Sequence, residues 1–478
     1  MLLKIDGKNY GKDCKQTPVV HVYSGEVIDT VPDATPEMVD IAISAAQKGY
    51  QVWSKKTQYE RNVILTRFIE NFEAERESLA QLLAKENGKN IKQADGEFDS
   101  CHALFQGYME KAAHMYGNVL PAGGIQTSSP HDVVFTVREP IGVSVCLLPF
   151  NYPIDLFGHK IAPALVAGNA VIIKPPTDCP LTILRMVELL HKSGVPENVV
   201  QCITGRGRTI GDLLTGDPRV QIVSMTGSTA TGIHIYETAA RNLARVYLEL
   251  GGNDAVIVCE DADLDLAVRE VIGGRMGNMG QTCCGSKRFI VQKTVADAFA
   301  DRLETALKQV TIGDPMDPNN DQGTLISIAA AKEVEEQVAT TISQGAVCTL
   351  GGKAYGNGFF EATVLRSVTK DMDVAKDMEI FGPVFPIIPY ETLDEAIAIA
   401  NQSSYGLMGA ILTSDMKKAV SAAMQMECGG VAINGSSCYR TSETPFGGYK
   451  KSGIGREGVS ATLLEWTQEK TIALKGVM

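Results

Sequence analysis

The sequence predicts an α/β protein that contains a doubly wound parallel sheet and a second α/β domain. Strand-like apolar runs alternate with segments of helical length, first over residues 140–250 and again over residues 255–434. Both series lie in a chain of 478 residues, of which 44% are hydrophobic. A chain of this length and apolar content buries more than one core, so two or three domains are expected.

Helical periodicity comes first along the chain, over residues 34–95. One periodic stretch covers residues 36–42 and a second covers residues 61–85, with acidic residues such as Glu37 in the first turns. Apolar residues spaced three and four apart form one face of a helix. The chain is therefore expected to open with a helical region.

A nucleotide-binding domain is predicted next, over residues 140–250. Residues 142–148 form a continuous apolar run, which is typical of a strand buried on both faces. Further strand candidates alternate with helical segments, and this alternation implies a parallel sheet. These strands are 170–175, 199–203, 222–224 and 245–249, and the helices between them end at residue 166, cover 181–193 and follow residue 229.

A second series of strands and helices begins at residues 255–258 and ends near residues 430–434. It passes through the segment around Cys283 and has the length of a separate catalytic domain. Residues 133–137 and 467–475 alternate like edge strands and belong to neither series. We expect them to share a small sheet used for subunit contact.

Composition argues against several functional classes. The formal net charge of −12 and the pI near 5.2 oppose a nucleic-acid or anionic-membrane partner. Residues 1–15 lack the pattern of a signal peptide, and no apolar run reaches membrane-spanning length. Eleven irregularly spaced cysteines do not suggest a disulfide framework, so a cytoplasmic protein is expected. The seven histidines form no short-spaced pair, so no metal site is predicted.

Cys283 is the candidate nucleophile. It lies in the glycine-punctuated segment GNMGQTCCG at residues 277–285, just before a strand-like run at residues 288–292. Loops of this type expose a side chain, although a cysteine is more often a small buried hydrophobe. On this segment alone the two interpretations are equally good. For the neighbouring Cys284, the structural interpretation is the stronger one.

Six sequence blocks resemble the aldehyde dehydrogenase superfamily, in the order found in that family and through nearly the whole chain. The resemblance implies the aldehyde dehydrogenase fold, with a Rossmann-like cofactor domain (1–115 and 139–249) and an α/β catalytic domain (250–455). A small β oligomerisation element (116–138 and 456–478) would complete a homodimer or homotetramer. The blocks are PFNYP at 149–153, TGST at 226–229, LELGG at 248–252, GQTC at 280–283, EIFGPV at 379–384 and PFGG at 445–448.

The resemblance implies NAD(P)-dependent oxidation of an aldehyde to a carboxylate. Cys283 matches the nucleophile, whose thiolate attacks the aldehyde and gives a thiohemiacetal. Asn151 matches the side-chain amide that forms an oxyanion hole with the backbone N–H of the nucleophile. Loss of hydride leaves a thioester, and Glu249 matches the general base for the water that cleaves it.

Other functions stay open beside this one. Acylating members of the superfamily resolve the thioester with the thiol of CoA and lack the residue that matches Glu249. A structural member without activity would have no chemical need for Cys283, Glu249 and Asn151 together. The simpler interpretations are a turn residue for Asn151 and a solvated strand-end carboxylate for Glu249. The presence of all three residues favours a hydrolytic enzyme with a free carboxylate product.

The cofactor residues also follow from the resemblance. Lys174 matches the lysine that holds the adenosine ribose, and Ser228 after Gly227 matches the helix N-terminus that faces the pyrophosphate. Glu379 matches the residue that binds the nicotinamide ribose, and Phe381 the aromatic residue beside the nicotinamide. Leu250 belongs to the same set. Both Glu379 and Phe381 could instead be ordinary loop residues.

One departure from the family pattern concerns the choice between NAD and NADP. NAD-preferring relatives often have a Glu three residues after the ribose-binding lysine, where it repels a 2′-phosphate. This chain has Thr177 there. We therefore predict that NADP is accepted, with NAD use still possible. A tenfold preference requires only about 1.4 kcal/mol.

The substrate signal is weaker. Parts of the chain resemble NADP-dependent non-phosphorylating glyceraldehyde-3-phosphate dehydrogenases, which implies Tyr152 and Arg440 as phosphate ligands. Thr282 and Ser100 stand where that branch has further arginines. The segment at residues 445–458 resembles semialdehyde and lactaldehyde dehydrogenases instead. We predict a small polar or anionic aldehyde, with Arg440 as its anchor unless it is a solvated loop arginine. The candidates are succinic semialdehyde, lactaldehyde and glyceraldehyde-3-phosphate.

Overall fold

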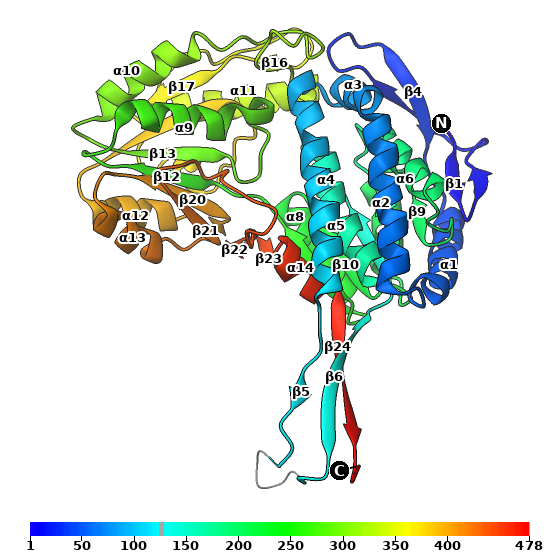
Figure 1. The fold of residues 1–478 in the computed structure, drawn as a ribbon. Coiled ribbons are helices and arrows are strands. Elements are labelled where there is room, and N and C mark those ends of the chain that lie inside the picture. Colours follow the sequence, from blue (N-terminus) through cyan, green and yellow to red (C-terminus); the bar gives the residue numbers. More distant parts are fainter. Residues whose placement is uncertain (124–128, 478) are drawn as a thin grey trace.

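The computed structural model describes residues 1–123 and 129–477 and shows two α/β lobes, with a narrow arm projecting from one of them (Figure 1). Residues 124–128 and 478, which belong to the predicted oligomerisation element, lie outside the described residues. The predicted α/β fold class is confirmed by the sheets and helices of both lobes.

A six-stranded sheet forms the centre of the first lobe. Its strand order reverses between β7 and β10, which is the mark of a doubly wound sheet, and only β23 is antiparallel to its neighbour. Such sheets bind ligands at the carboxyl ends of the strands beside this reversal. The strands in order are β23 (Gly453–Ile454), β11 (Arg245–Glu249), β10 (Ile222–Thr226), β7 (Val143–Leu147), β8 (Ala170–Lys174) and β9 (Val200–Cys202).

Helices cover both faces of this sheet (Figure 1), which explains why β7 and β8 are apolar at successive positions. Along β8, Val171 and Ile173 pack into one core, whereas Ile172 packs into the other. The first core contains residues of α2 (Gln58–Ala74), α3 (Arg76–Asn87), α4 (Ile91–Ala113), α5 (Pro153–Ala167), α6 (Leu181–Lys192) and α14 (Val459–Glu465). The second contains residues of α1 (Pro36–Trp53), α7 (Gly207–Thr215) and α8 (Thr229–Ala240).

A seven-stranded sheet forms the centre of the second lobe. All its neighbouring strands are parallel except the pair β14–β17. The order is β14 (Val347–Leu350), β17 (Thr363–Arg366), β18 (Val384–Tyr390), β13 (Ser286–Gln292), β12 (Asp254–Val258), β20 (Met408–Leu412) and β21 (Gly430–Ile433). The accompanying helices are α9 (Leu264–Met276), η1 (Gly277–Gly280), α10 (Ala296–Leu307), α11 (Ile328–Ser343), η2 (Asp373–Ala375), α12 (Leu393–Asn401) and α13 (Met416–Gln425).

The arm is a three-stranded antiparallel sheet of β24 (Thr467–Leu474), β6 (Val133–Pro140) and β5 (Val119–Leu120). The predicted shared sheet is therefore present, but β6 is its central strand and not an edge. Short two-stranded sheets complete the described fold. They pair β1 (Leu3–Ile5) with β2 (Lys8–Tyr10), β3 (Gln16–Val20) with β4 (Val27–Pro32), β15 (Ala354–Tyr355) with β16 (Phe359–Phe360), and β19 (Tyr405–Gly406) with β22 (Tyr449–Lys450).

The end of the chain returns from the second lobe to the first. Strand β23, which falls within the predicted catalytic range 250–455, pairs with β11 of the six-stranded sheet. Helix α14 then packs on α4 and α5 before the chain enters the arm. The predicted division into domains therefore stays a prediction. We call residues 453–466, which carry β23, Glu457 and α14, the returning segment. Among the described residues, no helix is long and apolar enough to cross a membrane.

Candidate active site

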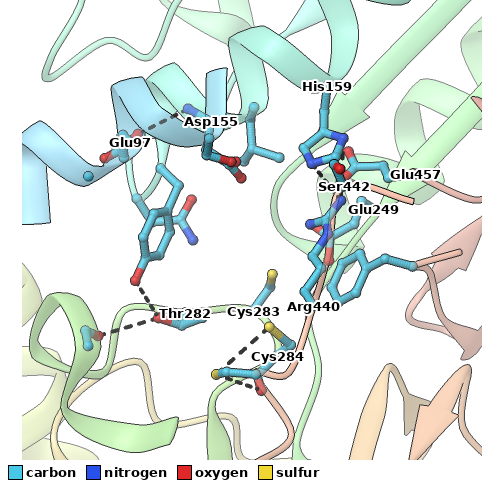
Figure 2. A pocket seen from close by; sticks show the side chains of 18 of the residues that line it. Glu97, Asp155, His159, Glu249, Thr282, Cys283, Cys284, Arg440, Ser442 and Glu457 are labelled. Atoms are coloured by element: carbon cyan, nitrogen blue, oxygen red, sulfur yellow. Dashed lines mark hydrogen bonds and ion pairs between the residues drawn. The ribbon is translucent and has the colours of Figure 1, made fainter. Parts of the chain in front are cut away.

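A cavity of about 450 Å³ lies where the lobes meet, and five predicted site residues line it. They are Asn151, Tyr152, Glu249, Cys283 and Arg440. Figure 2 shows Cys283 between Thr282 and Arg440, with Glu249, Glu457 and His159 along one wall. Glu249 is the last residue of β11 and Asn151 follows β7, so the doubly wound sheet delivers both from the carboxyl ends of its strands.

The loop before Cys283 has a rare backbone conformation. Asn278, Met279 and Gly280 have φ values of 50°, 57° and 77°. Left-handed geometry at a residue other than glycine costs about 1–3 kcal/mol and persists only where its surroundings enforce it. A Cβ atom at Gly280 would lie 2.4 Å from the carbonyl oxygen of Gly382, so this position requires glycine. The turn presents Cys283 to the cavity.

Hydrogen bonds tie this loop to the Asn151 turn. Asn278 Nδ2 donates to the Asn151 carbonyl oxygen at 2.8 Å, and Lys89 Nζ donates to the same oxygen at 2.6 Å. Lys89 also forms a buried ion pair with Glu97. The Asn151 side-chain amide forms no hydrogen bond with any described residue, and neither does the Cys283 backbone N–H. Both N–H groups are therefore available to an oxygen atom in the cavity.

Glu249 and Cys283 influence each other's ionisation. Glu249 is only 4% exposed, and neither carboxylate oxygen has a hydrogen-bond partner among the described residues. Burial, together with the nearby Cys283 thiol, raises the pKa of Glu249 well above its usual range. The Cys284 side chain and burial raise the pKa of Cys283, while the Lys287 cation opposes that shift. Both groups therefore favour their neutral forms before substrate arrives.

Glu379 and Phe381 lie beside Cys283, next to a lysine that the sequence did not single out. Lys287 Nζ forms an ion pair with Glu379 Oε1 at 3.1 Å, donates to the Cys283 carbonyl oxygen, and lies 5.8 Å from the centre of the Phe381 ring. Phe381 also contacts Phe150 edge to face, with ring centres 6.0 Å apart. This group forms a charged and aromatic border to the site.

A second cavity, of about 660 Å³, lies at the carboxyl ends of β7, β8 and β10. Lys174 is the last residue of β8 and lines this cavity, and among the described residues its Nζ donates one side-chain hydrogen bond, to the Pro175 carbonyl oxygen at 3.0 Å. The hydroxyl of Thr226, another lining residue, is buried and has no hydrogen-bond partner in the described part of the chain. Unpaired donors around a roomy cavity fit the hydroxyl groups of a dinucleotide.

The N-terminus of α8 faces the same cavity, which Ala230 and Thr231 line. Ser228 is the N-cap of α8, and its hydroxyl accepts a hydrogen bond from Thr231 N at 3.4 Å. The Gly227 N–H donates to the Glu249 carbonyl oxygen, and the Leu250 N–H donates to the Ser452 carbonyl oxygen. This helix end has the polarity that favours a pyrophosphate.

Thr177 lies in the loop between β8 and α6, and the acidic residue of this loop is Asp178, one position later. Burial lowers the pKa of Lys174, while the Asp178 carboxylate opposes that shift. A carboxylate therefore acts on Lys174 although position 177 carries none. The sequence pattern around Thr177 did not reveal this.

Tyr152 and Arg440 lie on different parts of the cavity wall. The Tyr152 hydroxyl lies 3.3 Å from the Thr282 hydroxyl, and Lys89 Nζ lies 4.3 Å from the centre of its ring. Arg440 is not a solvated loop residue. Its Nη2 contacts Glu457 Oε2 at 2.9 Å and His159 Nε2 at 2.8 Å, and its guanidinium stacks on Phe446.

The structure adds residues that the sequence pattern missed. Burial raises the pKa of Glu457, but Lys160, His159 and Arg440 around it outweigh burial and lower that pKa. Burial and the neighbouring Arg440 lower the pKa of His159 to about 4, so this imidazole is neutral at physiological pH. These residues come from α5 and from the returning segment, and no sequence motif joins them. Asp155 is a further lining residue.

A sheet built for dinucleotide binding, joined to a cavity with a cysteine, a buried carboxylate and a free amide, is the arrangement of a thiol-dependent oxidoreductase. Residues 10–472 match the aldehyde dehydrogenase family. The chain belongs to this family and is an NAD(P)-dependent oxidoreductase acting on aldehydes.

Two similar proteins have named activities. The chain is 35% identical to a 3-sulfolactaldehyde dehydrogenase of Priestia aryabhattai, over 95% of this chain and 94% of the relative. It is also 35% identical to a glutarate-semialdehyde dehydrogenase of Pseudomonas putida, over 98% of this chain and 97% of the relative.

Solved structures have the same fold. An NADP-dependent enzyme of E. coli superposes with a TM-score of 0.95 at 32% identity, covering 99% of this chain and 98% of the other. A betaine aldehyde dehydrogenase of Staphylococcus aureus in complex with NAD+ superposes with a TM-score of 0.94 at 33% identity, covering 99% and 95%. The predicted aldehyde dehydrogenase fold is confirmed.

Proposed function

We propose that this enzyme oxidises a small polar or anionic aldehyde to a free carboxylate through a covalent intermediate on Cys283. The observation that carries the proposal is the shared cavity of Cys283, Glu249 and Asn151, in which a thiol, a general base and an oxyanion donor surround one space. The three residues come from different elements, and their side chains are held by the sheet end and by the left-handed loop.

In the first half of the reaction, the Cys283 thiol loses its proton to solvent water, and the resulting thiolate attacks the aldehyde carbon, so that a C–S bond forms as the C=O π bond breaks. The oxygen becomes an alkoxide, which the Asn151 amide and the Cys283 backbone N–H stabilise as hydrogen-bond donors. NAD(P)+, when bound, supplies the oxidant that accepts the hydride of the former aldehyde carbon. Lys174, Ser228 and Glu379, with Gly227, Leu250 and Phe381, would hold it.

In the second half, Glu249 removes a proton from a water molecule that attacks the thioester carbon. The C–S bond breaks, Cys283 leaves as a thiolate and the product leaves as a carboxylate. The pKa of Glu249 is raised partly by Cys283. Once the thiol is a thioester, it cannot ionise, so Glu249 loses its proton more readily at the stage where a base is needed.

Initial rates with a panel of aldehydes test this function. Succinic semialdehyde, lactaldehyde, glyceraldehyde-3-phosphate and propanal would each be assayed with NAD and with NADP. We expect the polar and acidic aldehydes to give a higher kcat/KM than propanal, as the named activities of the relatives suggest. Adding CoA separates the acylating alternative, because an acyl-CoA product would replace the free acid.

Arg440 is proposed to anchor the acidic end of the substrate. Replacing it with methionine is expected to lower kcat/KM for succinic semialdehyde about 10- to 100-fold, mainly through KM, because a charge-assisted hydrogen bond is lost. Arg302→Met, on the exposed face of α10, is the matched control. Equal kcat/KM values for every acidic aldehyde in wild type and Arg440→Met would show that Arg440 holds only Glu457 and His159.

Thr177 is proposed to permit NADP. We expect Thr177→Glu to shift the ratio of kcat/KM for NADP to that for NAD at least about tenfold toward NAD, because the new carboxylate would repel the 2′-phosphate. Thr177→Gln is the uncharged control of equal length. If both variants change the ratio equally, charge at this position is not the determinant.

The three-stranded arm is proposed as the contact surface of a homodimer or homotetramer. Exposed Val119 and Leu120 of the edge strand β5 support this, since an exposed edge strand with apolar side chains is a ready template for pairing with a partner. We also propose a cytoplasmic enzyme, because the chemistry of Cys283 needs a compartment that keeps thiols reduced.

A further inference from the structure

Asp155 lies in the first turn of α5, four residues after Asn151, and lines the Cys283 cavity. In Figure 2 it lies on the opposite side of the cavity from Arg440 and Glu457, with Cys283 below the space between them. An aldehyde that reaches Cys283 therefore enters the cavity that this carboxylate lines.

The Asp155 carboxylate has fewer partners than Glu97 and Glu457, the two acids of the cavity that form ion pairs. Glu97 is paired with Lys89, and Glu457 is paired with Lys160 at 3.1 Å and Arg440 at 2.9 Å. Asp155 accepts one hydrogen bond, from the Ser100 hydroxyl to Oδ1. Within residues 1–123 and 129–477, no cation lies within ion-pair distance of it, and Oδ2 accepts no hydrogen bond.

The position of Asp155 is fixed by the elements around it. The Glu97 carboxylate accepts hydrogen bonds from the backbone N–H groups of Ile154, at 2.9 Å, and Asp155, at 3.2 Å. Glu97 is itself held by Lys89, which also holds the Asn151 carbonyl oxygen. The Asp155 carboxylate and the Asn151 amide therefore both lie at the N-terminal end of α5, which Glu97 and Lys89 hold in place. A specific polar contact needs this kind of support.

The opposite wall has the complementary property. The Arg440 guanidinium contacts Glu457 and His159 through Nη2, while its buried Nε–H has no partner among the described residues. One wall of the cavity thus offers an unfilled acceptor and the other an unfilled donor. The buried Arg440 Nε–H costs free energy until a ligand satisfies it, and the half-buried Asp155 Oδ2 is open to a donor from the same ligand, so each wall selects the opposite chemistry in the substrate.

We propose that Asp155, supported by Ser100, binds a hydrogen-bond donor on the carbon chain of the aldehyde, so that the preferred substrates are short aldehydes bearing a hydroxyl or ammonium group. This inference rests on the proposed function of the Cys283 cavity and adds to it. Arg440 would bind an acidic group of such a substrate. Asp155 would distinguish an aldehyde whose carbon chain bears a hydroxyl or ammonium group from an unsubstituted alkanal.

Two substrate pairs test the proposal, each differing by one donor group. Lactaldehyde is compared with propanal for the hydroxyl, and 3-aminopropanal with propanal for the ammonium. We expect the wild type to favour at least one substituted aldehyde about tenfold or more in kcat/KM, since Asp155 would supply a charge-assisted hydrogen bond. In Asp155→Leu this ratio should fall at least fivefold for the same pair.

Asp155→Asn repeats the measurement with less disturbance of the helix start. It should lower the hydroxyl ratio less than Asp155→Leu does, and abolish any ammonium preference. Asp99→Asn, on the exposed face of α4, is the control and should leave both ratios unchanged. The substrate pair whose kcat/KM ratio falls in the Asp155 variants identifies the donor group, hydroxyl or ammonium, that Asp155 binds.

Two results overturn the inference: wild-type ratios near one for both pairs, or ratios that stay the same in both Asp155 variants. A failure of the proposed function looks different, because then no aldehyde of the set reduces NAD or NADP.

Discussion

Cys283→Ala is expected to abolish reduction of NAD and NADP by every aldehyde, with a loss in kcat/KM of at least about 10⁴-fold. The proposed chemistry needs a C–S bond to the aldehyde carbon, and the side chain of alanine cannot form one. The measurement is the initial rate of reduced cofactor formation, with thermal unfolding used to verify that the variant is folded. Residual turnover at wild-type rates would refute the nucleophile assignment.

The adjacent Cys284 provides the matched control. Its thiol packs with Leu407 and Phe446, and its sulfur lies 3.9 Å from that of Cys438. Cys284→Ala should therefore retain turnover. The Cys284 side chain is the largest influence that raises the pKa of Cys283, so its removal should also move the rising limb of the pH–kcat/KM profile to lower pH. If Cys284→Ala lost turnover and Cys283→Ala kept it, Cys284 would be the nucleophile and Cys283 the structural cysteine.

The strands of the first lobe were predictable because burial on both faces leaves a clear signal. Residues 142–148 are apolar apart from Ser144, residues 170–173 are all apolar, and the structure places β7 and β8 there with helices on both sides. The meeting of Asn151, Glu249 and Cys283 was implied by the family resemblance of the sequence blocks. Asn151 follows β7, Glu249 ends β11 and Cys283 precedes β13. Their roles remain proposals, but their shared cavity is a property of the fold.

Other features depend on tertiary contacts that leave no local pattern. Asn278 and Met279 have left-handed geometry only because partners from distant segments hold them, such as Gln93 and Gln322. Asp155 reads as an ordinary acidic residue that complements a helix dipole. The partners of Arg440 are His159 of α5 and Glu457 of the returning segment. The sequence could therefore identify the arginine, but it could not show that a buried carboxylate and a neutral imidazole contact its guanidinium.

Glu249→Gln is expected to separate the two halves of the reaction. Hydride transfer needs Cys283 and the oxyanion donors, so a burst of about one equivalent of reduced cofactor per active site should remain. Thioester hydrolysis needs a base, so the steady-state rate should fall about 10²- to 10⁴-fold. Rapid-mixing measurements would resolve the burst from the slow phase. An added small thiol should restore turnover, because it attacks the thioester without help from Glu249.

Glu465→Gln is the control, because Glu465 is also a partly buried acid, whose pKa burial raises to about 7, but it does not line the Cys283 cavity. It should retain both the burst and the steady-state rate. If Glu249→Gln lost the burst as well, Glu249 would act before hydride transfer, as the base that ionises Cys283. The nearby Cys283 thiol raises the pKa of Glu249, whereas Glu249 lowers the pKa of Cys283, so Glu249 is placed to accept the thiol proton as well as a proton from water. Only the timing of the lost step shows which proton Glu249 removes.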